Sequence, residues 1–240
     1  MKNSETVSSS SRKDSASQSR EELAELAKLL EAQTRRRDRT KLHRYEPYNK
    51  QKKFHADGLV HRERLLMAGN QLGKTFCGAA EAAYHATGNY PEWWPGRRWE
   101  RPTRGWAGSK TGEVTRDGVQ RTLLGEPKDK SQWGTGMIPG DQVVDWSLRQ
   151  GLPDACDSIV VRHVSGGAST IGFKSYDQGR EKWQSETLDW AWLDEEPPAD
   201  IYIEALTRTN ATGGMLWMTF TPMLGMSDVV HMYIDECGLT

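Results

Sequence analysis

Apolar and polar positions divide the chain into three stretches. Residues 1–19 are rich in Ser and charged side chains and hold almost no large apolar ones, so we predict a disordered tail. Residues 20–39 are predicted to be helical, because leucines recur there at helical spacing. These leucines are Leu23, Leu26, Leu29 and Leu30. We expect this narrow apolar stripe to dock on the rest of the chain, and a partner-binding helix is the alternative.

From residue 64 onward, short apolar runs alternate with helical patterns. Strands are predicted at 64–68, 105–109, 189–193 and 215–221, and helices at 74–85, 111–124 and 199–208. Two more runs, 158–164 and 169–174, flank Gly166-Gly167 and predict a hairpin. Residues 88–102 are predicted as a loop and 125–153 as an irregular insertion. Such alternation is typical of a largely parallel sheet covered by helices on both faces.

The first predicted strand leads into a loop of the form [AG]-x-x-x-x-G-K-[ST]. Its residues are Ala68, Gly69, Asn70, Gln71, Leu72, Gly73, Lys74 and Thr75. Backbone N–H groups of such a loop surround a polyphosphate at a helix N-terminus. We expect Gly73 to allow a close backbone approach, Lys74 to reach the β- and γ-phosphates of ATP, and Thr75 to ligate Mg²⁺. An ordinary glycine turn is the alternative, but a strand precedes this loop and a helix follows it.

A pair of carboxylates follows the buried strand at 189–193. Asp194 comes directly after Leu193, where ligands bind in open α/β sheets, and we expect it to hold Mg²⁺ through water. Glu195 is the predicted base that orients and polarises the attacking water, and Glu196 is its rival. Together with the loop, this predicts an α/β fold of the P-loop NTPase (RecA-like, ASCE) kind that hydrolyses ATP. The predicted division is a tail at 1–19, a helix and basic linker at 20–44, and an ATPase domain at 45–240.

Composition and charge exclude several classes of protein. Fourteen Lys and Arg against eight Asp and Glu give residues 1–53 a net charge of +6, which leaves −7 for residues 54–240 out of a total of −1. Any DNA contact is therefore expected to be local, and the basic run at 35–53 could contact phosphates or be a solvated linker. The three cysteines form no CxxC pair, so neither a disulfide framework nor a zinc site is predicted. No apolar run approaches a membrane span, and no signal peptide is apparent.

Several motifs together resemble the ATPase domain of the large terminase subunit of tailed bacteriophages. They are the loop at 69–75, the run Ser-Tyr-Asp-Gln-Gly-Arg-Glu-Lys-Trp-Gln at 175–184, the acidic strand at 188–197, and Met-Thr-Phe-Thr-Pro at 218–222. The resemblance covers roughly residues 45–235. It implies an ATP-driven motor that moves double-stranded DNA into a procapsid in the host cytoplasm. A portal protein, a small terminase subunit and a homo-oligomeric ring are the implied partners, and no membrane is involved.

The resemblance also assigns further residues. Gln51 matches a glutamine that reads adenine, since an amide can both donate and accept hydrogen bonds. A surface polar residue is the alternative. Thr219 and Thr221 match a coupling motif that senses the γ-phosphate, and the alternative is a β-branched preference at a strand end.

Two positions depart from the family pattern. Asn70 and Gln184 stand where some members carry an arginine that can accelerate hydrolysis. Arg180 is the nearest candidate for such an arginine finger, acting across a subunit boundary, and a structural salt bridge is the alternative. The nuclease half of the family is expected beyond residue 240, so we predict no nuclease activity in this chain and interpret it as an isolated or truncated motor domain.

Three other functions compete with this one. A superfamily 2 helicase also joins a P-loop to an Asp-Glu strand end, but it needs a second RecA-like domain. A transporter ATPase is suggested by Ser165-Gly166-Gly167-Ala168, but that signature must open a helix and here it falls in a predicted hairpin turn. A DNA-binding or capsid-docking module with a degenerate pocket would bind no ATP–Mg²⁺.

Overall fold

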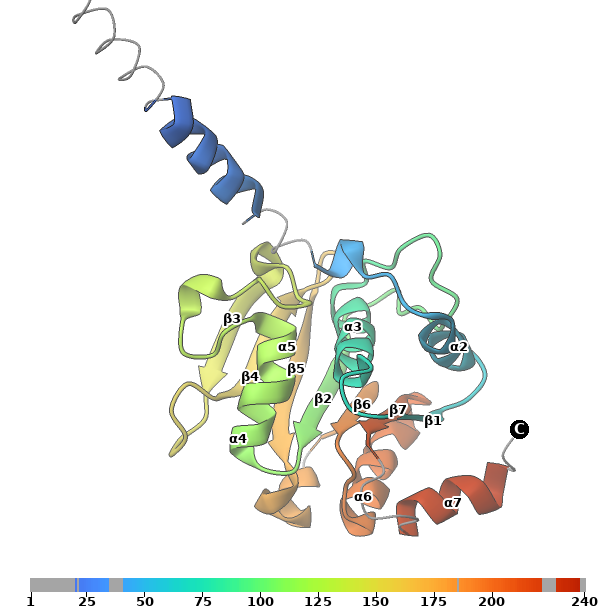
Figure 1. Cartoon of the computed structure of the whole chain (residues 1–240). Coiled ribbons are helices and arrows are strands. Elements are labelled where there is room, and N and C mark those ends of the chain that lie inside the picture. The colour runs from blue at the N-terminus through green and yellow to red at the C-terminus, as the bar shows by residue number, and fades with distance from the viewer. Residues whose placement is uncertain (1–19, 21, 35–40, 185, 222–227, 238–240) are drawn as a thin grey trace, which may run out of the picture. The chain divides into compact units, whose positions relative to one another are not determined.

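A seven-stranded sheet runs through the centre of the folded unit in the computed structural model (Figure 1). Its strand order is β1-β7-β6-β2-β5-β4-β3. The strands are β1 (Glu63–Met67), β2 (Arg104–Ser109), β3 (Val143–Leu148), β4 (Cys156–Arg162), β5 (Ala168–Ser175), β6 (Trp190–Asp194) and β7 (Met215–Phe220). The first five strands in the spatial order are parallel, and β4 and β3 are antiparallel additions at one edge.

The structure describes residues 20, 22–34, 41–184, 186–221 and 228–237. The chain divides into two units, Met1–Arg39 and Thr40–Thr240. In the first unit residues 22–34 are helical, as predicted. The predicted disordered tail and the end of this helix lie outside the described residues, and docking of its leucine stripe stays a prediction. No helix in the described ranges combines the length and apolar character that a membrane crossing requires.

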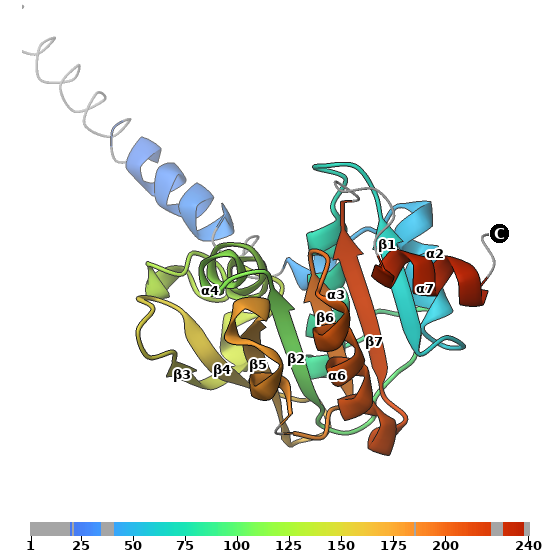
Figure 2. The same ribbon diagram turned by 90° about the horizontal axis from the view of Figure 1, so that it is seen from below.

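Helices cover both faces of the sheet (Figures 1 and 2). The longer ones are α2 (Asn49–Asp57), α3 (Lys74–Thr87), α6 (Ala199–Thr209) and α7 (Asp228–Cys237). The predicted helix at 111–124 is a composite of α4 (Gly112–Val114), a π-helical stretch (Thr115–Gln120) and α5 (Arg121–Leu124). Six 3₁₀ turns complete the described elements: Leu42–Arg44, Lys130–Gln132, Gly140–Gln142, Tyr176–Gln178, Arg180–Trp183 and Asn210–Thr212.

Alternation along the central strands produces two cores. In β6, Trp190 and Trp192 pack in the cluster that contains the alanines of α3, whereas Ala191 and Leu193 pack in the cluster of α6. The tryptophans fit because small residues face them. A Cβ at Gly78 of α3 would lie 2.5 Å from the Trp192 indole nitrogen. The prediction of an α/β fold with a mainly parallel sheet is confirmed.

Three elements differ from the sequence prediction. Residues 125–153 are not wholly irregular, because β3 forms the antiparallel edge; its side chains are mostly exposed, so no buried alternation marks it in the sequence. The helix α2 lies in a stretch described only as polar and aromatic by its composition, and α7 has no counterpart among the predicted helices. The hairpin is present, and its turn includes Gly166-Gly167, so that signature opens no helix.

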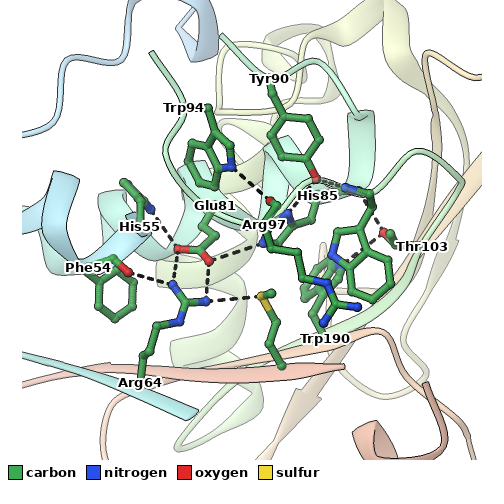
Figure 3. A network of polar contacts seen from close by, with 12 residues as sticks. Phe54, His55, Arg64, Glu81, His85, Tyr90, Trp94, Arg97, Thr103 and Trp190 are labelled. Carbon is green, nitrogen blue, oxygen red and sulfur yellow. Dashed lines mark hydrogen bonds and ion pairs between the residues drawn. The ribbon is translucent and has the colours of Figure 1, made fainter. Parts of the chain in front are cut away.

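A buried carboxylate, Glu81, joins the elements around the start of α3 (Figure 3). Arg64 of β1 donates to Glu81 through two nitrogens, at 2.5 and 3.1 Å. His55 of α2 lies 2.8 Å from the same carboxylate, and His85 lies 3.3 Å from it. Burial alone would raise the pKa of Glu81, but the Arg64 guanidinium and the two imidazole contacts hold that pKa well below its usual range. Three separate segments are thereby fixed to one helix.

We expect Glu81→Gln to lower the free energy of unfolding by about 3–5 kcal/mol, because it leaves the Arg64 cation buried without a counter-charge. Urea denaturation at neutral pH measures this change. Because folding depresses the Glu81 pKa, its stabilisation is present above the unfolded carboxyl pKa and is lost as pH falls through the folded value. The difference between the two proteins should therefore shrink in strong acid.

The matched control is Asp57→Asn, which breaks the exposed Lys53–Asp57 pair, 3.2 Å apart. Its effect should stay within about 0.5 kcal/mol, as for most surface pairs. Equal losses in the two variants would contradict the role given to Glu81.

Candidate functional site

The loop 68–73 connects β1 to the N-terminus of α3. Gly73 caps the helix at φ +73°, a left-handed conformation that favours glycine, and Gln71 also has a positive φ of 61°. Two left-handed residues in so short a loop turn its backbone sharply. The Lys74 ammonium is largely buried and donates to the Gly69 carbonyl at 2.7 Å. The lysine is thus held across the mouth of the loop.

The acidic strand end meets this loop directly. The Thr75 hydroxyl lies 3.1 and 3.3 Å from the two Asp194 carboxylate oxygens. This contact arises because β6 is separated from β1 only by β7, so the parallel strands end at one edge. The residues that the sequence assigned to the two halves of a nucleotide site are therefore side by side.

Asp194 is bound by hydroxyl groups. The Thr219 hydroxyl donates to it at 2.6 Å, and the indole nitrogen of Trp192 donates to the Thr219 oxygen at 2.8 Å. Because the oxygen of Thr219 accepts from the indole, its proton is directed at the carboxylate. Burial raises the pKa of Asp194 to about 6, although the hydrogen bonds from Thr219 and Thr75 oppose that rise.

These groups fit a magnesium ion. A threonine hydroxyl and a carboxylate are hard oxygen donors of the kind Mg²⁺ prefers. Within the part of the chain that the structure describes, no arginine or lysine is bonded to the buried Asp194 carboxylate, so a cation beside it would relieve the cost of its burial. The donor set therefore suits a metal bound together with a phosphate chain.

Glu195 has an unusual backbone. Its φ is +63°, which a non-glycine residue adopts rarely, and its N–H donates to the Thr219 carbonyl at 2.9 Å. Its carboxylate is about one-third exposed and lies 3.8 Å from the Lys110 ammonium. Glu196, its rival in the sequence, is also half-buried. Both glutamates thus stand at the strand edge that carries Thr75 and Asp194.

A cavity of about 850 Å³ opens beside the loop. Its lining includes Tyr45, Tyr48, Gln51, Gly73 and Lys74, and the volume is within the range of small-molecule sites. The Gln51 amide nitrogen donates to the Gly73 carbonyl at 3.1 Å, and its oxygen accepts from the Tyr48 N–H at 2.9 Å. Gln51 therefore connects α2 to the loop and still has one N–H and one lone pair for a ligand.

The remaining predicted residues lie at different distances from this centre. Thr221 donates to the side-chain oxygen of Asn70 in the loop at 3.0 Å. Arg180 follows β5, which three strands separate from β1, and it is bonded to Glu204 of α6 at 2.9 Å. The structure thus brings Thr219 and Thr221 to the loop and does not bring Arg180 there.

Sequence reasoning missed Trp192, Lys110 and Tyr176 as neighbours of the site. Trp192 has the pattern of a core residue, since nothing in the sequence reveals that its indole would meet Thr219. Lys110 follows β2 and approaches Glu195 only because β2 pairs with β6. The hydroxyl of Tyr176 contacts the backbone of Asp194 and Glu195, which no sequence motif indicates.

Solved structures with similar folds include the large terminase of a thermophilic bacteriophage, seen in several crystal forms. One, described as in complex with ADP, has a TM-score of 0.49 and 15% identity, and covers 80% of this chain and 43% of that chain. A second crystal form has a TM-score of 0.48 and 14% identity, and covers 80% and 44%.

Two curated relatives match most of the chain. The large terminase subunit of Salmonella phage P22 is 41% identical over 233 residues, which cover 90% of this chain and 47% of the relative. That of Enterobacteria phage LP7 is 26% identical over 236 residues, covering 90% and 48%. The chain thus spans about half the length of these relatives. The family model described as "Terminase large subunit, T4likevirus-type, N-terminal" matches residues 65–238, so the chain belongs to the terminase large subunit family.

Proposed function

We propose that this chain binds ATP with Mg²⁺ and hydrolyses it, as the motor of a machine that packages double-stranded DNA into a viral procapsid. The contact of Thr75 with Asp194, beside Lys74 and the 850 Å³ cavity, carries this proposal. It is the juxtaposition of a phosphate-binding loop and an acidic strand end that ATP hydrolysis requires. Family membership supports the packaging role.

Each residue has a role in this proposal. Lys74 exchanges the Gly69 carbonyl for the β- and γ-phosphates, and the loop N–H groups surround them. Thr75 and Asp194 would hold the magnesium ion, directly and through water, and the ion would neutralise charge on the phosphates. Gln51 reads the adenine with its remaining hydrogen-bonding capacity. Thr219 and Thr221 connect the metal side and the loop to β7, so a change at the γ-phosphate reaches both.

Glu195 acts as the base in this proposal. Its carboxylate is partly exposed at the strand edge, where it can orient a water and accept its proton. Asp194, whose oxygens are committed to Thr75 and Thr219, is poorly suited to that task. The Lys110 ammonium approaches the carboxylate of Glu195, and Glu196 serves as the comparison.

We expect Lys74→Ala to abolish ATP binding, because it removes the cation that meets the phosphates. Glu195→Ala should keep ATP binding within about threefold but lower kcat by at least about 10²-fold, since proton transfer contributes about that much. Fluorescent nucleotide titration and phosphate release measure the two quantities.

The control is Glu196→Ala, which removes a carboxylate of the same type one residue away. It should retain turnover. If Glu195→Ala hydrolyses ATP normally while Glu196→Ala does not, the base is Glu196. If wild-type protein neither binds nor hydrolyses ATP, the proposed function is wrong.

We further propose that Arg180 acts as an arginine finger on a neighbouring subunit in a ring. Its side chain is 55% exposed although it is bonded to Glu204, so the guanidinium is accessible to a second chain. Its position, away from the loop of its own chain, fits action in trans. The other proposed partners are the DNA, a portal protein and a small terminase subunit, in the host cytoplasm.

A complementation experiment tests the finger. Arg180→Ala and Lys74→Ala should each be inactive alone, and their mixture should recover hydrolysis because one chain supplies the arginine and the other the pocket. Wild-type turnover per chain should rise with protein concentration. Phosphate release over a concentration series measures both.

Arg208→Ala is the matched control, because Arg208 also pairs with Glu204, at 2.9 Å. If Arg180 only stabilises Glu204, the Arg208 variant should lose as much activity. Equal losses, or a mixture without recovered activity, would contradict a finger in trans.

A further inference from the structure

A tyrosine outside the proposed catalytic set touches the acidic strand end. Tyr176 begins the 3₁₀ turn that follows β5, and its hydroxyl lies 2.9 Å from the Asp194 carbonyl and 2.9 Å from the Glu195 carbonyl. A hydroxyl has one proton, so it is shared between two successive carbonyl oxygens. The group therefore acts on the backbone of the strand end and not on the carboxylates.

The tyrosine is built into the core. Its ring is buried, with its centroid 5.9 Å from that of Trp183, and burial raises the pKa of its hydroxyl well above the ordinary value. The hydroxyl stays protonated at neutral pH and remains a donor. Its position is fixed by packing, since the turn is also held by the Asp177 N–H, which donates to the Lys110 carbonyl at 3.1 Å.

The backbone that Tyr176 contacts is the unusual one. Glu195 has a φ of +63°, and such strained conformations persist only where the surroundings determine them. On one side the Glu195 N–H donates to the Thr219 carbonyl of β7. On the other side Tyr176 donates to the carbonyls of Asp194 and Glu195. The residue is thus held from two strands, β7 and β5, that lie on opposite sides of β6.

We propose that Tyr176 is a positioning residue for Glu195: its hydroxyl holds the Asp194–Glu195 backbone in the left-handed turn that aims the Glu195 carboxylate at the attacking water. This inference rests on the proposed function, in which Glu195 is the base. Tyr176 itself touches neither nucleotide nor water. Without its hydroxyl the Glu195 peptide is held from β7 alone, and the carboxylate is free to leave the reactive geometry.

The test is Tyr176→Phe, which keeps the ring against Trp183 and removes only the hydroxyl. We expect kcat for ATP to fall by about tenfold or more, since small misplacements of a catalytic group cost up to about 10² in rate. The dissociation constant for ADP should change less than about twofold, because the phosphate loop is untouched. Amide hydrogen exchange of a peptide covering residues 190–198 should become faster.

Tyr84→Phe is the matched control. The Tyr84 hydroxyl is also buried and also donates to a backbone carbonyl, that of Leu42, at 3.0 Å. Both variants lose one buried hydrogen bond of the same kind, so they should unfold at similar urea concentrations. Only the Tyr176 variant should lose kcat and gain exchange at 190–198.

Unchanged kcat and unchanged exchange in Tyr176→Phe would overturn the inference, as would equal loss of kcat in both variants. A wild-type protein without ATP turnover would instead overturn the proposed function. The exchange measurement needs no turnover, so it still decides whether Tyr176 holds the Glu195 backbone.

Discussion

The buried pair of Glu81 and Arg64 is the interaction on which the nucleotide site depends. Glu81 lies in α3, the helix that begins with Lys74 and Thr75, and its contacts fix to that helix both β1, which leads into the phosphate loop, and α2, which carries Gln51. The loop between β1 and α3 contains residues with positive φ and has little structure of its own. Its shape is therefore set by how its two flanking elements are held, and the buried ion pair holds them.

The acidic half of the site is anchored differently, through the aromatic core. Trp192 packs against α3 at Gly78 and also donates to Thr219, which in turn donates to Asp194. Packing of the sheet against α3 thus fixes the orientation of a proposed metal ligand. Because the phosphate loop leads into the same helix, α3 sets the positions of both halves. This accounts for the meeting of residues far apart in the chain.

The sequence predicted the parts of this arrangement that have a local signature. The loop at 68–75 and the strand ending at Asp194 follow from spacing and apolar runs, and the parallel sheet follows from their alternation. What it could not predict depends on neighbours across the sheet. Tyr176 reaches Asp194 only through the strand order, and β3 has too few buried side chains to show a strand pattern. The acidic Glu81 has the character of a surface residue of a helix until its partners on β1 and α2 are known.

The two buried carboxylates show why the site is built from such different interactions. Glu81 has an arginine as its partner, and its pKa is held well below the usual range, so its charge is fully compensated within the protein. Among the described residues Asp194 is bonded to neutral hydroxyl groups, and burial raises its pKa to about 6. An arginine at Asp194 would stabilise the apoprotein but would compete with a cation for the same oxygens. Hydroxyl groups orient the carboxylate without neutralising it, so its charge remains available to a metal–nucleotide complex.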